Sequence, residues 1–79
     1  MEEQNKNIKD ISIDTDTIQL DQFLKWANLV ESGGEAKNLI QAGKVTVNEE
    51  VEYSRSTKLT PGDVIKIEGF EWSCRVSGD

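Results

Sequence analysis

The apolar positions in the middle of this chain follow the period of a helix. Four of them, spaced three and four residues apart, predict the buried face of a first helix: Leu20, Phe23, Leu24 and Ala27. Ser32, with Glu35 three residues later, has the spacing of a capping box and predicts where a second helix begins. This helix should run to Ala42, bury Ala36, Leu39 and Ile40, and end at Gly43 in the left-handed conformation. The short connection predicts a helix–turn–helix corner.

Outside these helices, apolar and polar residues alternate, which predicts strands. The first strand is expected over residues 10–14, with Ile11 and Ile13 on one face, and others over residues 45–47, 51–53 and 64–67. Between them we expect a turn at residues 48–50, a polar loop over 54–58 and a type II turn over 60–63, where Pro and Gly hold the central positions. A last strand from Gly69 should carry four residues on one face: Phe70, Trp72, Cys74 and Val76.

This order of elements predicts an α+β fold, in which the two-helix corner packs on a small antiparallel sheet. Neither helix connects parallel strands through a long crossover, which argues against a doubly wound fold. With 79 residues the chain is expected to form a single domain over residues 10–79, after a flexible tail over residues 1–9.

The composition excludes several classes of protein. Histidine is absent and Cys74 is the single cysteine, so we expect no catalytic residues, no metal site, no cofactor and no disulfide. The chain has neither a membrane-length apolar run nor the pattern of a signal peptide, which predicts a cytoplasmic protein without a membrane partner. A binding module is therefore favoured over an enzyme.

Charge is unevenly distributed along the chain. The net charge is −6, yet residues 25–48 hold three bases and two acids, whereas the flanking segments are acidic. On the predicted second helix, Lys37, Gln41 and Lys44 form one polar stripe beside the apolar face. This stripe is either a solvated helix face or a surface for an anionic ligand.

Several short motifs, taken in order, resemble the S-four domain, the alpha-L RNA-binding motif. They are Leu20-Asp21-Gln22-Phe23-Leu24, Ser32-Gly33-Gly34-Glu35-Ala36-Lys37, Leu39-Ile40, Gly43, Val45, Val47-Asn48, Lys58-Leu59 and Pro61-Gly62-Asp63. They cover about 50 residues, and the most similar members are the small stand-alone bacterial proteins of the YaaA and YbcJ type. The resemblance implies a non-catalytic protein that recognises structured RNA, ribosomal or transfer RNA, through the helix pair and the following hairpin.

Carried over by position, the resemblance implies a set of RNA-binding residues on that surface. They are Asp21, Ser32, Gly33, Gly34, Lys37, Asn38, Gln41, Lys44, Asn48, Arg55 and Lys58. The exposed amides of Gly33 and Gly34 would form an anion site at the helix start. Asn48 is expected to serve its turn first and RNA second, while Arg55 and Lys58 either contact phosphate or keep a loop soluble.

The chain departs from the family pattern in ways that lower its positive charge. Gln19 stands where many members have a base, Gly33 stands where many have Arg, and Asn48-Glu49 replaces Asn-Gly. The loop Ser54-Arg55-Ser56-Thr57 is less basic than in the relatives. We therefore expect modest, steeply salt-dependent RNA affinity.

The acidic residues motivate an alternative function. Glu49, Glu50 and Glu52 form an acidic hairpin that would repel RNA, so it should point away from phosphate or toward a protein. The alternative is a protein-interaction adaptor on the same fold, with weak or no RNA binding. Trp26 and Trp72 could stack on bases, but core packing is the favoured prediction for both, and Cys74 should be buried.

Overall fold

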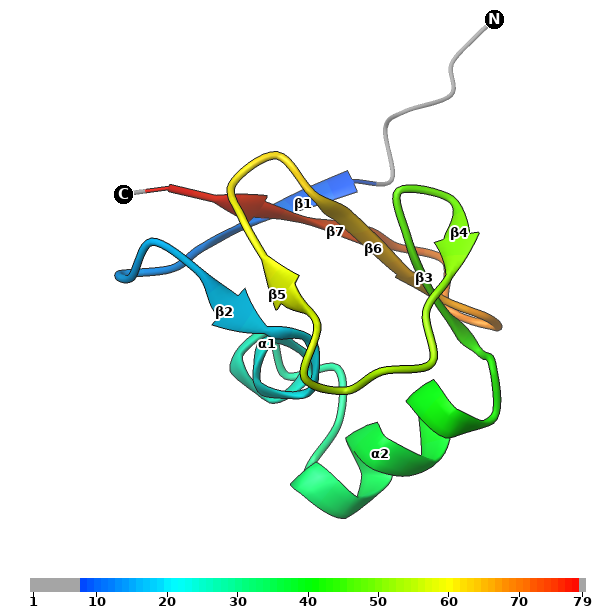
Figure 1. The fold of residues 1–79 in the computed structure, drawn as a ribbon. Helices are drawn as coiled ribbons and strands as arrows, with labels where there is room; N and C mark the ends of the chain where they lie inside the picture. Colours follow the sequence, from blue (N-terminus) through cyan, green and yellow to red (C-terminus); the bar gives the residue numbers. More distant parts are fainter. Residues whose placement is uncertain (1–7, 79) are drawn as a thin grey trace, which may run out of the picture.

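The computed structural model describes residues 8–78, which form two helices on one side of a main sheet (Figure 1). The helices are α1 (Leu20–Trp26) and α2 (Gly33–Gln41). The strands are β1 (Ile8–Ser12), β2 (Ile18–Gln19), β3 (Val45–Val47), β4 (Glu50–Val51), β5 (Lys58–Leu59), β6 (Val64–Ile67) and β7 (Ser73–Ser77). Most of the predicted tail lies outside the described residues, but Ile8 and Lys9 belong to β1, which therefore begins two residues earlier than predicted.

The main sheet has the order β1-β7-β6-β3-β4 and is mixed rather than purely antiparallel. Its β7–β6, β6–β3 and β3–β4 pairs are antiparallel, whereas β1 and β7 are parallel, with Ile8 opposite Ser73. Because these two neighbouring strands are far apart along the chain, no tight turn forces them to run in opposite directions. The α+β class is confirmed. A separate antiparallel pair, β2 with β5, was not predicted, since strands of two residues show no alternation.

The start of α2 confirms half of the predicted capping box. The Ser32 hydroxyl accepts a hydrogen bond from the Glu35 amide at 3.2 Å, as the motif requires. The Glu35 carboxylate, however, accepts from the amide of Glu31 at 2.9 Å and not from that of Ser32. The reciprocal bond therefore reaches one residue further back and ties the connecting segment to the first turn of α2.

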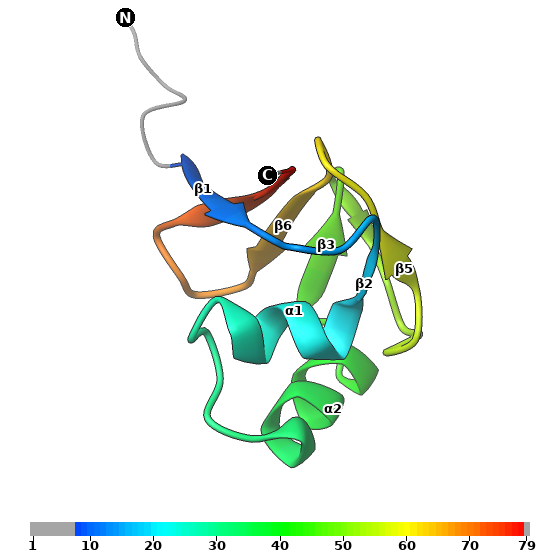
Figure 2. The same ribbon diagram turned by 90° about the vertical axis from the view of Figure 1, so that its left-hand side faces the viewer.

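Both helices end in the same way. Gly43 takes a φ of +77°, its amide donates to Ile40 O at 3.1 Å, and the Lys44 amide donates to Leu39 O, as in a Schellman motif. The end of α1 has the same pair of bonds, with Asn28 at a φ of +60° in the place of glycine. This sharp end sends the chain into the corner before α2 (Figure 2).

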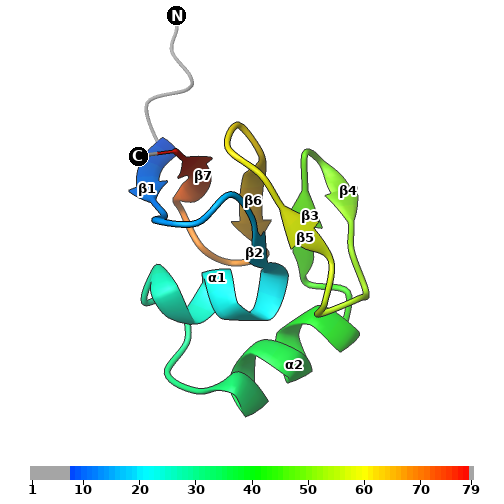
Figure 3. The ribbon, with the colours of Figure 1, turned by 60° about the vertical axis from the view of Figure 1, so that its left-hand side comes forward.

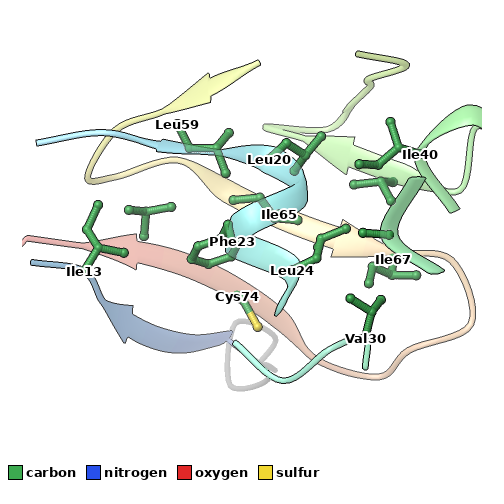
Figure 4. Close-up of a cluster of buried hydrophobic side chains, with 13 residues drawn as sticks. Ile13, Leu20, Phe23, Leu24, Val30, Ile40, Leu59, Ile65, Ile67 and Cys74 are labelled. Carbon is green, nitrogen blue, oxygen red and sulfur yellow. The ribbon is translucent and has the colours of Figure 1, made fainter. Parts of the chain in front are cut away.

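The core lies between the helices and the inner face of the main sheet (Figure 4). Phe23 and Leu24 of α1, Ile40 of α2 and Ile65 of β6 are at most 1% exposed, and Cys74 is buried as predicted. Burial of apolar surface at about 25 cal/mol per Å² is the main stabilising contribution to such a core. Neither helix within residues 8–78 has the length and hydrophobicity that crossing a bilayer requires.

The prediction that both tryptophans pack in the core is wrong. Trp26 is 55% exposed and Trp72 is 45% exposed. Trp26 lies off the apolar stripe of α1 and donates from its indole N–H to Ser12 O at 2.7 Å. Trp72 precedes β7, which begins only at Ser73, so the strand alternation does not extend back to it or to Phe70, which is 40% exposed.

Candidate nucleic-acid interface

The exposed face of α2 carries the polar stripe that the sequence predicts. Lys37, Asn38 and Gln41 are exposed, whereas Ala36 and Ile40, on the opposite side, are fully buried. Lys44 is exposed just beyond the helix end. The predicted stripe therefore includes two helical residues, Lys37 and Gln41, and a third, Lys44, that follows the left-handed Gly43.

At the other end of α2, the space around Gly33 and Gly34 is not filled by packed atoms of the domain. A Cβ at Gly33 would meet nothing within 4 Å, and one at Gly34 would meet only the Ser32 hydroxyl at 3.9 Å. No packing inside the described domain therefore requires glycine at these positions. Gly33 and Gly34 are exposed, as the prediction of close approach by a ligand requires, whereas the amide of Glu35 is already bonded to the Ser32 hydroxyl.

The loop between β4 and β5 is held against the start of α1 (Figure 3). The Asp21 amide donates to Arg55 O at 3.1 Å, and the Leu20 amide donates to Thr57 O at 2.8 Å. Gln19, the residue that precedes the helix, forms no side-chain cap, so these loop carbonyls satisfy the first amides of α1 instead. The contacts fix the backbone of Arg55, whose side chain is exposed, and Lys58 follows in β5.

Tyr53 joins this loop to the end of α2, and the sequence analysis assigned it no functional role. Its side chain is 65% exposed. A Cβ added to Gly43 would lie 3.2 Å from Tyr53 Cε1 and 3.3 Å from its Oη, so the ring lies against the glycine that ends α2. No local pattern in the sequence indicates this contact, because β4 ends at Val51 and Tyr53 meets Gly43 only in the folded domain.

Asn48 is not brought together with the α2 residues. It lies in the turn between β3 and β4, at the other end of β3 from Lys44 (Figure 3). Its side-chain amide donates to Asp63 Oδ1 at 3.0 Å, and its own Oδ1 accepts from the Val64 amide at 3.0 Å. With a φ of +53°, Asn48 has the turn role that was expected first, and both polar atoms of its side chain form hydrogen bonds within the domain.

Asp21 also has a position different from the other predicted site residues. It lies in the first turn of α1, where the helix dipole favours an anion. Its Oδ1 atom is covered by neighbouring atoms and has no hydrogen-bond partner within residues 8–78. That oxygen is therefore not available to a ligand, and its carboxylate would repel phosphate.

One cation of the described domain forms an ion pair within it, and the others do not. Arg75 is paired with Asp10 at 2.6 Å on the sheet, and the hydrogen bond from its guanidinium lowers the pKa of Asp10 from its ordinary value. No such ion pair to a residue in the range 8–78 involves the four cations of α2 and the loop: Lys37, Lys44, Arg55 and Lys58. The described residues contain no cluster of side chains suited to a metal ion.

Comparison with known proteins places this fold in a family. A model of the S4 domain matches residues 11–74. The chain belongs to the S4-domain family. A relative from Bacillus subtilis (strain 168), described as "Probable ribosome maturation protein RlbA", is 52% identical over 60 residues, which cover 76% of this chain and 84% of the relative. The resemblance seen in the sequence is therefore confirmed.

A solved structure also shares the fold of this S4 domain. The 30S ribosomal protein S4e from Thermoplasma acidophilum superposes with a TM-score of 0.58 over 77% of this chain, at 22% identity. The chain spans only 31% of the length of that protein, so the likeness concerns the fold alone. The S4-domain match includes every predicted RNA-binding residue as well as Tyr53, but which of these residues contact a ligand stays a prediction.

Proposed function

We propose that this S4 domain is a non-catalytic module that binds structured RNA, and ribosomal RNA in particular. The binding site in this proposal is the α2–loop surface, which consists of Lys37, Asn38, Gln41, Lys44 and residues 53–58. The observation that carries the proposal is the set of four exposed cations on this surface, unpaired within residues 8–78. The description of the relative from Bacillus subtilis, a probable ribosome maturation protein, supports a ribosomal ligand.

The chemistry of the surface suits backbone recognition better than base reading. Lysine and arginine side chains neutralise phosphates and set the register of a protein on RNA without reading its sequence. Asn38 and Gln41 lie on the same exposed face and can donate to or accept from a 2′-hydroxyl, the group that distinguishes RNA from DNA. The domain would therefore select a folded RNA by its shape.

An NMR titration of the full chain tests this proposal. Amide shifts are expected to concentrate at Lys37, Gln41, Lys44 and Arg55 when a folded ribosomal RNA fragment is added at low salt, with smaller effects from a DNA duplex. Amides of β1, at the sheet edge opposite β4, serve as an internal control. Absence of shifts on the α2–loop surface with several structured RNAs would refute the proposal.

A second candidate function is protein docking, and the exposed aromatic residues beside β7 favour it. Phe70 and Trp72 border a shallow groove whose other lining residues include Ile11, Ala27 and Leu29. Large exposed aromatic residues are typical of protein interfaces. Co-purification with and without ribonuclease separates the two functions. A partner that survives nuclease treatment and is lost in Trp72→Ala supports docking, and loss of all partners with nuclease supports RNA binding.

A further inference from the structure

A shallow groove lies on the outer face of the sheet, next to the end of α2. It is lined by Gly43, Lys44, Thr46, Val51, Lys66 and Glu68. Thr46 of β3 is opposite both Val51 of β4 and Lys66 of β6, so these three side chains share the face of the sheet that the helices do not cover. Val51 is 47% exposed and gives the groove an apolar side on β4, across β3 from Lys66.

Tyr53 stands at the edge of this groove. The Glu52 amide donates to Val45 O at 3.0 Å, which continues the β3–β4 pairing and places Tyr53 across from Lys44. One side of the ring lies against Gly43, and 65% of the side chain remains exposed. The hydroxyl-bearing end of the ring is thus held next to Gly43, and most of the residue is exposed, so that a base can reach the ring as stacking requires.

We propose that Tyr53 stacks an unpaired nucleotide of the bound RNA while Lys44 and Lys66 hold its phosphates. This inference rests on the proposed function, because Lys44 belongs to both the α2–loop surface and the groove. An RNA strand that leaves the α2 face at Lys44 would pass directly onto Tyr53. Every base has a π face, so stacking of this kind is tolerant of sequence.

The charges of the groove favour a nucleotide over an acidic or a purely apolar peptide. Two lysines face one carboxylate, that of Glu68, whose amide also donates to Lys44 O at 2.8 Å. Glu52 lies beside Tyr53, but its carboxylate accepts a hydrogen bond from the Ser54 amide at 3.2 Å and is directed along its own loop. A nucleotide suits both parts of the groove, because its phosphate can lie between the two ammonium groups while its base stacks on the Tyr53 ring.

The test compares two RNAs with the full chain in a fluorescence anisotropy titration. One is a stem-loop with a blunt end, and the other is the same stem-loop with a single-stranded tail of five uridines. We expect tighter binding of the tailed RNA, and Tyr53→Leu should weaken that binding by about 5- to 150-fold, the usual value of one stacked base. Tyr53→Phe, which retains the ring, should stay within twofold of the natural protein.

Phe70→Leu is the matched control, because it removes another exposed aromatic ring outside the groove. A tail that contains 4-thiouridine should crosslink to the tryptic peptide of residues 45–55, which holds Tyr53, and this readout needs no variant to fold. Equal affinity for the two RNAs, or a Tyr53→Leu affinity like that of Phe70→Leu, would overturn the stacking inference and leave RNA binding by α2 intact. Failure of both RNAs to bind would overturn the proposed function as well.

Discussion

Neutralising Lys37 and Lys44 should make the affinity for RNA depend less steeply on salt concentration, by an amount that follows from the number of phosphate contacts. Four exposed side chains, Lys37, Lys44, Arg55 and Lys58, form no ion pair within residues 8–78 and are free to replace counterions on phosphate. Each contact contributes a slope of about −0.7 on single-stranded and −0.9 on duplex nucleic acid when the logarithm of the binding constant is plotted against that of the salt concentration. Four contacts give a slope of about −2.8 to −3.6, or a loss of about 50- to 150-fold in affinity between 50 and 200 mM salt.

The double variant Lys37→Gln/Lys44→Gln removes two of these charges and should reduce the slope to about −1.4 to −1.8. Its matched control is Lys9→Gln, since Lys9 lies in β1, at the opposite edge of the sheet from β4, with its ammonium near the Trp72 ring. Binding of one ribosomal RNA fragment would be measured by anisotropy at five salt concentrations for the three proteins. An unchanged slope in the double variant, or an equal change in Lys9→Gln, would refute the assignment of phosphate contacts to α2.

Three further predictions concern stability and reactivity. Glu49 is the second residue of the two-residue turn Asn48-Glu49 and has a φ of +74°. Glu49→Gly should relieve this left-handed strain and raise the free energy of unfolding by about 1 kcal/mol, which corresponds to a melting temperature about 4–8 °C higher. An unchanged or lower melting temperature would contradict this expectation. Burial raises the pKa of the Cys74 thiol, so stability should be full below the ordinary pKa of a thiol and fall as the pH rises above it, because only the unfolded chain then ionises. Under native conditions a thiol reagent should label Cys74 only as fast as the domain opens, and labelling at the rate of a free thiol would show that the side chain is accessible.

The sequence predicted the helix ends and the turn that are determined by a few neighbouring residues. The capping serine, the glycine that ends α2 and the type II turn were each readable, because a few neighbouring residues decide them. In the turn, Gly62 has a φ of +102° and the Asp63 amide donates to Thr60 O at 3.1 Å, as expected. The predicted stripe of α2 is exposed for the same reason, since one helix period fixes both its buried and its exposed face.

Features that depend on distant segments could not be predicted in this way. The parallel direction of β1 and β7 is decided by packing across the whole domain, and nothing near Ile8 or Ser73 encodes it. The exposure of Trp72 depends on where β7 begins, which is set by its register with β1 and β6. Tyr53 was missed because its importance comes from Gly43, ten residues earlier in the chain, whose missing side chain leaves room for the ring.

The arrangement of charges explains how a domain of net charge −6 can present a surface to RNA. The acidic turn at Glu49 and Glu50 lies beyond Asn48, at the end of β3 opposite Lys44. Four residue steps of about 3.3 Å place Lys44 and Asn48 about 13 Å apart, which exceeds the Debye length of about 8 Å at physiological salt. Repulsion from the acidic turn is therefore largely screened at the α2–loop surface, while the short contacts proposed between phosphate and Lys37 and Lys44 would not be screened. The local balance of charge, rather than the net charge, decides whether this S4 domain binds RNA.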